Sequence, residues 1–341
     1  MTQDAAVCAD ARASRISELK PLINKYQIPS NAKAIRQIAN SLGPYLLLWF
    51  LMYLALQVSW WLVVPIAVLT GAFLVRIFII FHDCGHGSYF SSSRANRIVG
   101  FFCAMLVFTP YEQWRREHAA HHASAGNLDR RGLGDIWTMT VKEYQQASTG
   151  KRILYRVVRN PFFLFVIAPA YMFIISQRIP LRSMKRRERL SVWQMNLAVL
   201  AMVSTMMFIF GVVPYLVIQL IVITVGGSAG FWLFYIQHQF EGVYWERDQN
   251  WDFIDAALQG SSFYKLPRVL QWFSGNIGFH HIHHLSPRIP NYNLEQCHDS
   301  HPMFKDVRAV TLLSSFSAMS FNLWDESSHR LVAFREVKKI A

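Results

Sequence analysis

The sequence predicts an all-α polytopic membrane protein with four transmembrane helices in two hairpins and a cytoplasmic helical cap that carries clustered histidines. Hydrophobic residues make up 52% of the 341 residues, charged residues only 16%, and the mean hydropathy is +0.19. These values do not suit a soluble protein. No charged residue occurs from Gln37 to Val75 or from Leu190 to Phe240, and each stretch is long enough for two crossings of about 20 residues.

The predicted elements follow the chain in order. Residues 1–36 are polar and of mixed charge, without the pattern of a signal peptide, so we expect them in the cytoplasm. Residues 37–341 form the expected membrane domain. Its reversals fall at Ser59–Pro65 and Gly211–Pro214, because proline and glycine break helices, and these turns face the non-cytoplasmic side. The four spans are expected at about 44–60, 63–81, 192–211 and 213–237.

Two further apolar segments, 98–110 and 161–176, are too short to cross about 30 Å of hydrocarbon, and we expect them to be interfacial or re-entrant. The remaining regions, 82–160 and 238–341, then lie in the cytoplasm. This topology places the basic segments on one face, as the excess of Lys and Arg in cytoplasmic loops requires. These segments are Arg12–Arg36, Arg94–Arg97, Lys151–Arg159 and Arg178–Arg189.

Composition and cysteine spacing exclude several classes of protein. The formal net charge of +13 is expected in cytoplasmic loops and at anionic headgroups, and no motif indicates binding to nucleic acid. The four cysteines show no repeated spacing and no CxxC pair, so neither a disulfide framework nor a thiolate zinc site is indicated. They are Cys8, Cys84, Cys103 and Cys297.

Histidines carry the functional signal. Eight of the 13 fall in three short boxes, HDCGH, HAAHH and HHIHH. On a helix, positions i, i+3 and i+4 form a compact patch, so each box is expected to present its imidazoles in one direction, as metal ligands. Eight imidazoles just past membrane segments would otherwise be costly groups without partners. The eight are His82, His86, His118, His121, His122, His280, His283 and His284.

A ninth histidine, His238 in QHQFE, ends the last predicted span at the same edge. Nine nitrogen donors are too many for one ion but fit two, and imidazole suits iron, zinc or copper. The absence of HExxH and ExxH weakens the zinc-protease and carboxylate-bridged di-iron interpretations. Four other histidines are expected outside the ligand set: His281, His298, His301 and His329.

The motifs HDCGHGSYF, WRREHAAHHASAGNLDRRGLGDIW, QHQFE and GNIGFHHIHHLSPRIPNYN resemble those of the membrane fatty acid desaturases, most closely the bacterial acyl-lipid branch, over about residues 40–330. The resemblance implies that the nine histidines bind two iron ions. It also implies that the protein uses O2 to introduce a cis double bond into the acyl chain of a membrane lipid. Asn276 is the candidate for a water-linked asparagine ligand known in some relatives.

The same resemblance implies an integral protein of the bacterial inner (cytoplasmic) membrane with its histidine boxes facing the cytoplasm. The fused cytochrome b5 domain of some relatives is missing, since His301-Pro302 is followed by Met303-Phe304. Electrons are therefore expected from a separate ferredoxin, flavodoxin or cytochrome b5 type donor. Two alternatives stay open: a di-iron lipid hydroxylase or ketolase, and a divalent-metal transporter with histidines along its path.

Several charged residues near the boxes have two interpretations. A carboxylate beside a box either orients a ligand imidazole through its second nitrogen or forms a surface ion pair with a nearby arginine. The four candidates are Asp83, Asp129, Asp135 and Glu241. Arg76, within the second predicted span, is expected to extend its side chain to the cytoplasmic interface.

Overall fold

The computed structural model describes residue 15, residues 17–132 and residues 134–337. The predictions for Cys8 and Arg12 therefore lie outside the described residues. The prediction of a mainly helical protein is confirmed, and two small sheets, which the sequence analysis did not predict, accompany the helices. Three of the four cysteines, Cys84, Cys103 and Cys297, are buried and unpaired with one another.

Four helices are long and apolar enough to cross a membrane, as predicted, and a bent pair of shorter helices is the only further candidate in the described residues. They form two sequential pairs with very short turns, one at 57–59 and one at Gly211. Pro44 and Pro65 both lie inside helices, so neither proline ends a helix here, although each removes one backbone hydrogen bond. The four are α2 (Asn31–Leu56), α3 (Trp60–His86), α9 (Arg186–Phe210) and α10 (Val212–His238).

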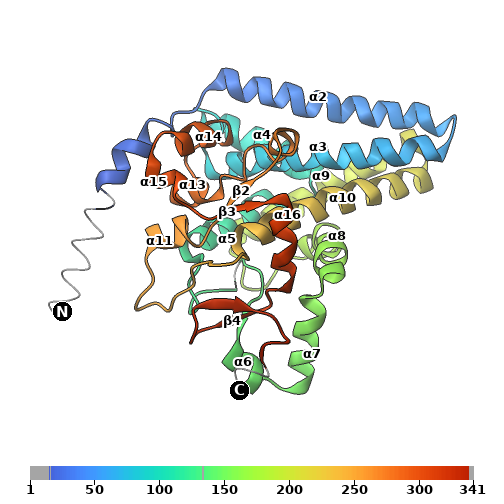
Figure 1. The fold of residues 1–341 in the computed structure, drawn as a ribbon. Coiled ribbons are helices and arrows are strands. Elements are labelled where there is room, and N and C mark those ends of the chain that lie inside the picture. The colour runs from blue at the N-terminus through green and yellow to red at the C-terminus, as the bar shows by residue number, and fades with distance from the viewer. Residues whose placement is uncertain (1–14, 16, 133, 338–341) are drawn as a thin grey trace.

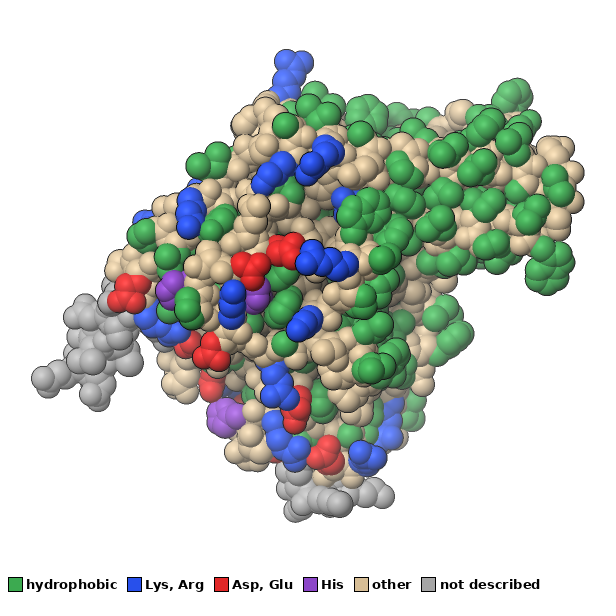
Figure 2. Space-filling model, turned by 45° about the horizontal axis from the view of Figure 1, so that its top comes forward, with side chains coloured by type: hydrophobic (Ala, Val, Ile, Leu, Met, Phe, Trp, Pro, Cys, Tyr) green, Lys and Arg blue, Asp and Glu red, His purple; other side chains and the backbone are tan. Residues whose placement is uncertain are grey.

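Helix α3 lies at the centre of this bundle and packs against α2, α10 and a shorter helix, α4 (Ser93–Leu106). Its contact with α10 depends on small residues, because a Cβ atom added at Gly71 would lie 2.7 Å from the Cβ of Val225. The outer helices leave many apolar side chains exposed, and Phe208 is 92% exposed. Figure 2 shows these side chains as a broad hydrophobic surface over the long helices, as expected for a surface that faces lipid.

The shorter helices and turns gather at and below one end of the long helices (Figure 1). The two short apolar segments fold as α4 and as a π-helical turn, η1, continued by α8. The short helices are α4 (Ser93–Leu106), α5 (Tyr111–Ser124), α6 (Val141–Gln146), α7 (Thr149–Val158), α8 (Ala168–Ile174), α11 (Phe253–Leu258), α12 (Arg268–Phe273), α13 (His280–Leu285), α14 (Asn291–Asp299), α15 (Pro302–Lys305) and α16 (Leu312–Ser315). The remaining turns are η1 (Phe163–Ile167), η2 (Ser176–Arg178) and η3 (Phe316–Ser320).

Two small sheets join segments that are distant in sequence. In the first, β1 pairs in parallel with β4, which pairs antiparallel with β5; in the second, β2 and β3 are parallel. These pairings hold together the segments that surround the end of α10. The strands are β1 (Met139–Thr140), β2 (Phe263–Lys265), β3 (Ala309–Thr311), β4 (Leu323–Asp325) and β5 (Arg330–Val332).

Arg76 does not extend to an interface, and that prediction was wrong. The side chain is only 6% exposed. Its guanidinium donates to the backbone oxygen of Trp272 and to Asn40 Oδ1, and it lies 3.9 Å from the centre of the Trp272 ring. This guanidinium has partners inside the protein, so Arg76 ties α12 to α2 and α3, although its Nε is buried without a hydrogen-bond partner in the described residues.

Candidate metal centre

Four helices bring the histidines together at one edge of the bundle. His82 and His86 occupy the last turn of α3, which stops at Gly87 in the left-handed conformation (φ 71°). His238 is the last residue of α10. The short helices α5 and α13 carry the other two boxes and pack across these ends. The candidate site is therefore assembled from four helices.

Each HxxHH box divides its imidazoles between two groups, so the prediction that a box presents them in one direction was wrong. In α5, His118 and His122 join one group and His121 the other; in α13, His280 and His284 share a group and His283 does not. The reason is helical geometry: positions i and i+4 lie about 40° apart around the axis, whereas i+3 and i+4 lie about 100° apart.

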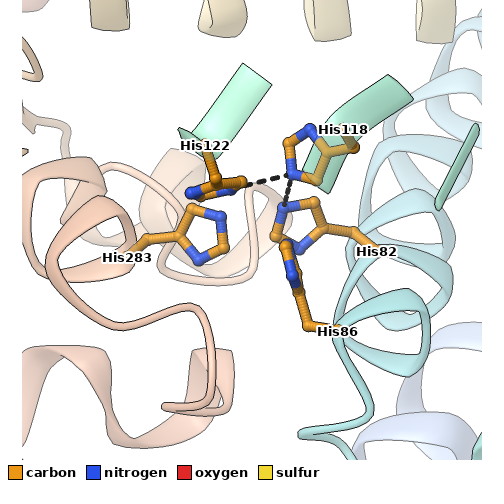
Figure 3. A group of neighbouring side chains, drawn as sticks. All are labelled: His82, His86, His118, His122 and His283. Atoms are coloured by element: carbon orange, nitrogen blue, oxygen red, sulfur yellow. Dashed lines mark hydrogen bonds between the residues drawn. The ribbon is translucent and has the colours of Figure 1, made fainter. Parts of the chain in front are cut away.

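The first group contains His82, His86, His118, His122 and His283, and Figure 3 shows these five imidazoles converging from α3, α5 and α13. Their candidate ligand nitrogens all lie within 4.8 Å of one another. The Nε2 of His118 lies 3.0 Å from that of His82 and 3.2 Å from that of His122. Five nitrogens at this spacing could hold one metal ion.

The second group contains His121, His238, His280 and His284, all buried, with candidate ligand nitrogens again within 4.8 Å of one another. The Nε2 of His238 lies 3.1 Å from that of His121 and 3.0 Å from that of His280. The two groups adjoin, because the rings of His122 and His284 stack at 4.2 Å. In the described residues, the two groups contain histidine alone.

Two of the four candidate carboxylates orient site histidines, and two form surface ion pairs. Asp83 Oδ1 lies 2.9 Å from Nδ1 of His82, and Asp135 Oδ1 lies 2.5 Å from Nδ1 of His121. The other oxygen of Asp83 accepts from the backbone and side-chain nitrogens of Asn291, which connects the first box to the start of α14. By contrast, Asp129 pairs with Arg247, and Glu241 pairs with Arg308.

These contacts fix tautomers that favour a cation in the second group. Asp135 accepts the Nδ1 proton of His121, and the Gly260 carbonyl, 3.2 Å away, accepts that of His238. A neutral imidazole protonated at Nδ1 carries a lone pair at Nε2. The Nε2 atoms of His121 and His238 therefore aim lone pairs at each other across 3.1 Å. A metal ion between them would convert this repulsion into ligation.

Burial favours the neutral form, which binds a metal, for several imidazoles outside the long helices. Desolvation, and then the neighbouring imidazoles, lower the pKa of His118, His122 and His284 well below the usual range. Both ring nitrogens of His283 are buried without a hydrogen-bond partner in the described residues. Such a group is costly unless something ligates it, and a metal ion in the first group would do so.

The remaining histidines lie apart from both groups. His281 Nε2 contacts His298 Nδ1 and the Phe304 oxygen, each at 3.1 Å, and burial lowers the pKa of His281 to about 3. His301 accepts a hydrogen bond at the start of α15, and His329 lies 3.4 Å from Glu246.

Asn276, the candidate asparagine, bonds elsewhere. Its side chain accepts from Gln271 and donates to the Asn291 oxygen. No hydrogen bond between its carboxamide and a site histidine occurs in the described residues.

Sequence reasoning missed the aromatic side chains that cover the site and the asparagine that holds Asp83. Trp114 stacks on His118 at 4.4 Å, and Phe234 lies 5.1 Å from His121 and 5.2 Å from His238. Both aromatic residues stand four positions before a site histidine on the same helix, a spacing that places side chains on one face. That spacing was the available signal, whereas nothing local connects Asn291 with Asp83.

Comparison with known proteins places the chain. Residues 59–310 match the family model described as fatty acid desaturase. A protein named fatty acid desaturase from Bacillus subtilis is 44% identical over 96% of this chain and 93% of its own length.

Two relatives from Synechocystis are more distant. The sn-1 oleoyl-lipid 12-desaturase is 26% identical over 73% of this chain and 71% of its own length. The sn-1 acyl-lipid omega-3 desaturase (ferredoxin) is 27% identical over 71% of this chain and 68% of its own length. With a family model that spans most of the histidine-bearing region and a near relative that aligns almost end to end, the chain belongs to the fatty acid desaturase family.

Proposed function

We propose that the nine histidines are the ligands of two iron ions, with five in the first group and four in the second. The single observation that carries this proposal is the division of nine buried or partly buried imidazoles into two convergent sets. Bound iron, together with dioxygen, would supply the oxidising power that hydrogen removal from an unactivated methylene needs and that side chains lack.

Iron suits both the ligands and the reaction, whereas zinc suits the ligands alone. The two groups offer imidazole nitrogens within 4.8 Å of one another, and imidazole binds iron as well as zinc. Removal of hydrogen from a methylene needs a redox-active ion, and zinc is not redox-active.

The proposed reaction converts a –CH2–CH2– unit of an acyl chain into a cis double bond. One hydrogen leaves each of two adjacent carbons. O2 is reduced to two waters with these two hydrogens and with two electrons and two protons from outside the protein. The family's name gives the desaturation of fatty acids. The use of O2, the two iron ions and the lipid-bound acyl chain are the proposed parts. The names of the two Synechocystis relatives, which specify oleoyl-lipid and acyl-lipid substrates, support a lipid-bound chain.

The chain's own residues would position and protect the site. Asp83, Asp135 and the Gly260 carbonyl each hold the Nδ1 proton of one histidine, which fixes the ring and raises its basicity as a ligand. Trp114 and Phe234 cover imidazoles of the two groups. Apolar cover of this kind excludes water, which would compete with the lipid for the oxidant.

The proposed location is a bacterial inner membrane, with the histidine end of the four long helices on the cytoplasmic side. The four apolar helices and the concentration of basic residues in the segments outside them support this orientation. Electrons would come from a separate carrier of the ferredoxin, flavodoxin or cytochrome b5 type. Ferredoxin appears in the name of one relative.

Expression in a bacterium that lacks the expected double bond tests the proposed function. We expect new acyl chains that have lost two hydrogens, with one double-bond position, in lipid extracts analysed by mass spectrometry. A matched His118→Ala variant should insert equally well and give no product. Products that have gained an oxygen atom would instead identify a hydroxylase or ketolase, and an unchanged lipid profile with inserted, iron-supplied protein would contradict the proposal.

A further inference from the structure

Helix α7 carries an apolar stripe on the side that faces away from the protein. Ile153, Leu154 and Val157 are 59%, 54% and 46% exposed. On a helix these positions fall within an arc of about 100°. Tyr155 and Arg159, which fall on the opposite side, are buried. Such a helix buries one face in the protein and leaves a second, apolar face exposed to its surroundings, and an apolar helix face is normally buried against a partner.

The contacts of the buried face prevent the stripe from turning inward. The Tyr155 hydroxyl donates to the Asn322 oxygen at 2.5 Å and accepts from the Met139 nitrogen at 3.1 Å. Just past the helix, Arg159 donates to the Phe321 oxygen at 2.6 Å and to Gln239 Oε1 at 3.0 Å. Rotation of α7 would break these buried hydrogen bonds, each costly to leave unmade. The outward direction of the stripe is therefore fixed.

Charge on α7 has a single sign. The helix contains Lys151, Arg152 and Arg156 and no acidic residue. None of the three forms an ion pair in the described residues, although Arg156 lies over the rings of Tyr144 and Phe334. An apolar stripe on a helix whose charged residues are all cations matches the boundary between acyl chains and anionic headgroups.

The position of α7 in the fold matches that boundary. In Figure 1, α7 runs across the direction of the four long helices, near the end that holds the histidines, and β4 lies on its protein side. Its stripe therefore faces the side toward which the long helices extend. The apolar surface continues through Phe162, 66% exposed, to Tyr171 and Ile174 of α8. Figure 2 shows hydrophobic side chains continuing below the bundle on this side.

We propose that α7 is an in-plane membrane anchor that binds the surface of an anionic phospholipid bilayer. Ile153, Leu154 and Val157 enter the outer part of the acyl region, and Lys151 and Arg152 contact phosphate groups. The inference rests on the membrane placement in the proposed function and is independent of the iron chemistry. It assigns this surface to lipid rather than to a protein partner.

The anchor is connected directly to the second histidine group. Arg159 donates to the Tyr235 hydroxyl and to Gln239, and Gln239 follows His238 in the chain. Lipid contact at α7 therefore sets the depth of this end of α10 relative to the bilayer surface. That role concerns positioning and involves no contact with the reacting atoms.

A fluorescence quenching experiment on the full-length protein tests the proposal. An environment-sensitive fluorophore is attached to Leu154→Cys in a Cys8→Ser background, which leaves the three buried cysteines in place. The protein is reconstituted in phosphatidylglycerol nanodiscs that contain lipids with a nitroxide near either the headgroup or the chain end. Asp299→Cys, with a side chain 62% exposed, is the water-facing control. Leu200→Cys, near the middle of α9 and at a position 61% exposed, is the membrane-core control.

We expect headgroup-region nitroxides to quench the Leu154→Cys label severalfold more than they quench Asp299→Cys, since interfacial helices bury their apolar face about 5–10 Å deep. Chain-end nitroxides should quench Leu200→Cys most. Quenching by aqueous iodide alone would overturn the proposal, as would protection from every quencher, which would indicate a covering protein. Strongest quenching by chain-end nitroxides would identify a membrane-crossing segment and also overturn it.

The basic residues provide a second arm. With phosphatidylcholine in place of phosphatidylglycerol, or with Lys151→Gln and Arg152→Gln together, headgroup-region quenching of the Leu154→Cys label should fall at least twofold. Equal quenching in both lipids would overturn the assignment to an anionic surface. Because neither measurement requires metal or turnover, failure here is distinguishable from failure of the proposed oxidation.

Discussion

Two of the nine imidazoles are each oriented by one carboxylate. Asp83 and Asp135 each hold the Nδ1 proton of one histidine, one in each group. The sequence placed both residues beside a box but left them equivalent to Asp129 and Glu241, which pair with arginines instead. The choice between a histidine and an arginine partner depends on tertiary position. For that reason the ligand types were predictable from sequence, and most of their supporting contacts were not.

At this scale, Asp135→Asn should lower iron affinity and activity about 10–100-fold, the usual effect of removing such a supporting carboxylate. The amide cannot supply the negative charge that polarises the Nδ1 proton of His121. Iron titration of the purified protein, followed by optical absorption, measures the affinity. Asp129→Asn is the matched control, and equal losses in the two variants would show that Asp135 acts only through general stability.

Individual helices fix the directions of the imidazoles. Long uncharged stretches predicted the four long helices, because a membrane requires continuous apolar length. Helical spacing alone also implies that the i+3 histidine of each HxxHH box points in another direction from the histidines at i and i+4. The small sheets were not predictable, since β1 pairs with β4 across most of the chain and the strands are too short for a period-two pattern.

At this scale, Gly71→Ala should destabilise the protein by about 1–3 kcal/mol, the typical cost of overpacking a tight contact. The new methyl group would lie 2.7 Å from the Val225 Cβ, an atom that cannot move without shifting α10. The thermal unfolding midpoint in nanodiscs is the measurement. Gly43→Ala in α2, where an added Cβ meets nothing within 4 Å, should leave the midpoint unchanged or raise it. Equal midpoints for the two variants would show that α3 and α10 do not need the close approach.

Across the whole molecule, the fold surrounds neutral histidines with protein. Desolvation lowers the pKa of His118, His122, His280, His283 and His284 well below the usual range. The arrangement gathers residues from segments up to 202 positions apart, from His82 to His284. Sequence could list these residues, but the division into five and four required the packing of α5 and α13 against the ends of α3 and α10.

At this scale, the metal-free protein should lose stability as the pH falls below about 6.5, the ordinary histidine pKa. Below that pH the unfolded chain takes up protons that the folded histidines, with their lowered pKa values, do not accept. Stability is therefore present above this pH and lost on acidification. The unfolding midpoint measured between about pH 7.5 and pH 5.5 tests this. His329→Gln, at an exposed position, should not alter the trend, and a midpoint that stays flat or rises on acidification would refute the explanation.

Iron content per chain tests the two-site assignment most directly. Protein purified from iron-supplied cells should contain about two irons, as nine nitrogens in two groups require. His86→Ala and His280→Ala, each in a different group, should each lower that content, and the double variant should lower it further than either. A wild-type content of one iron, or a single variant that removes both ions while the other removes none, would contradict two separate sites.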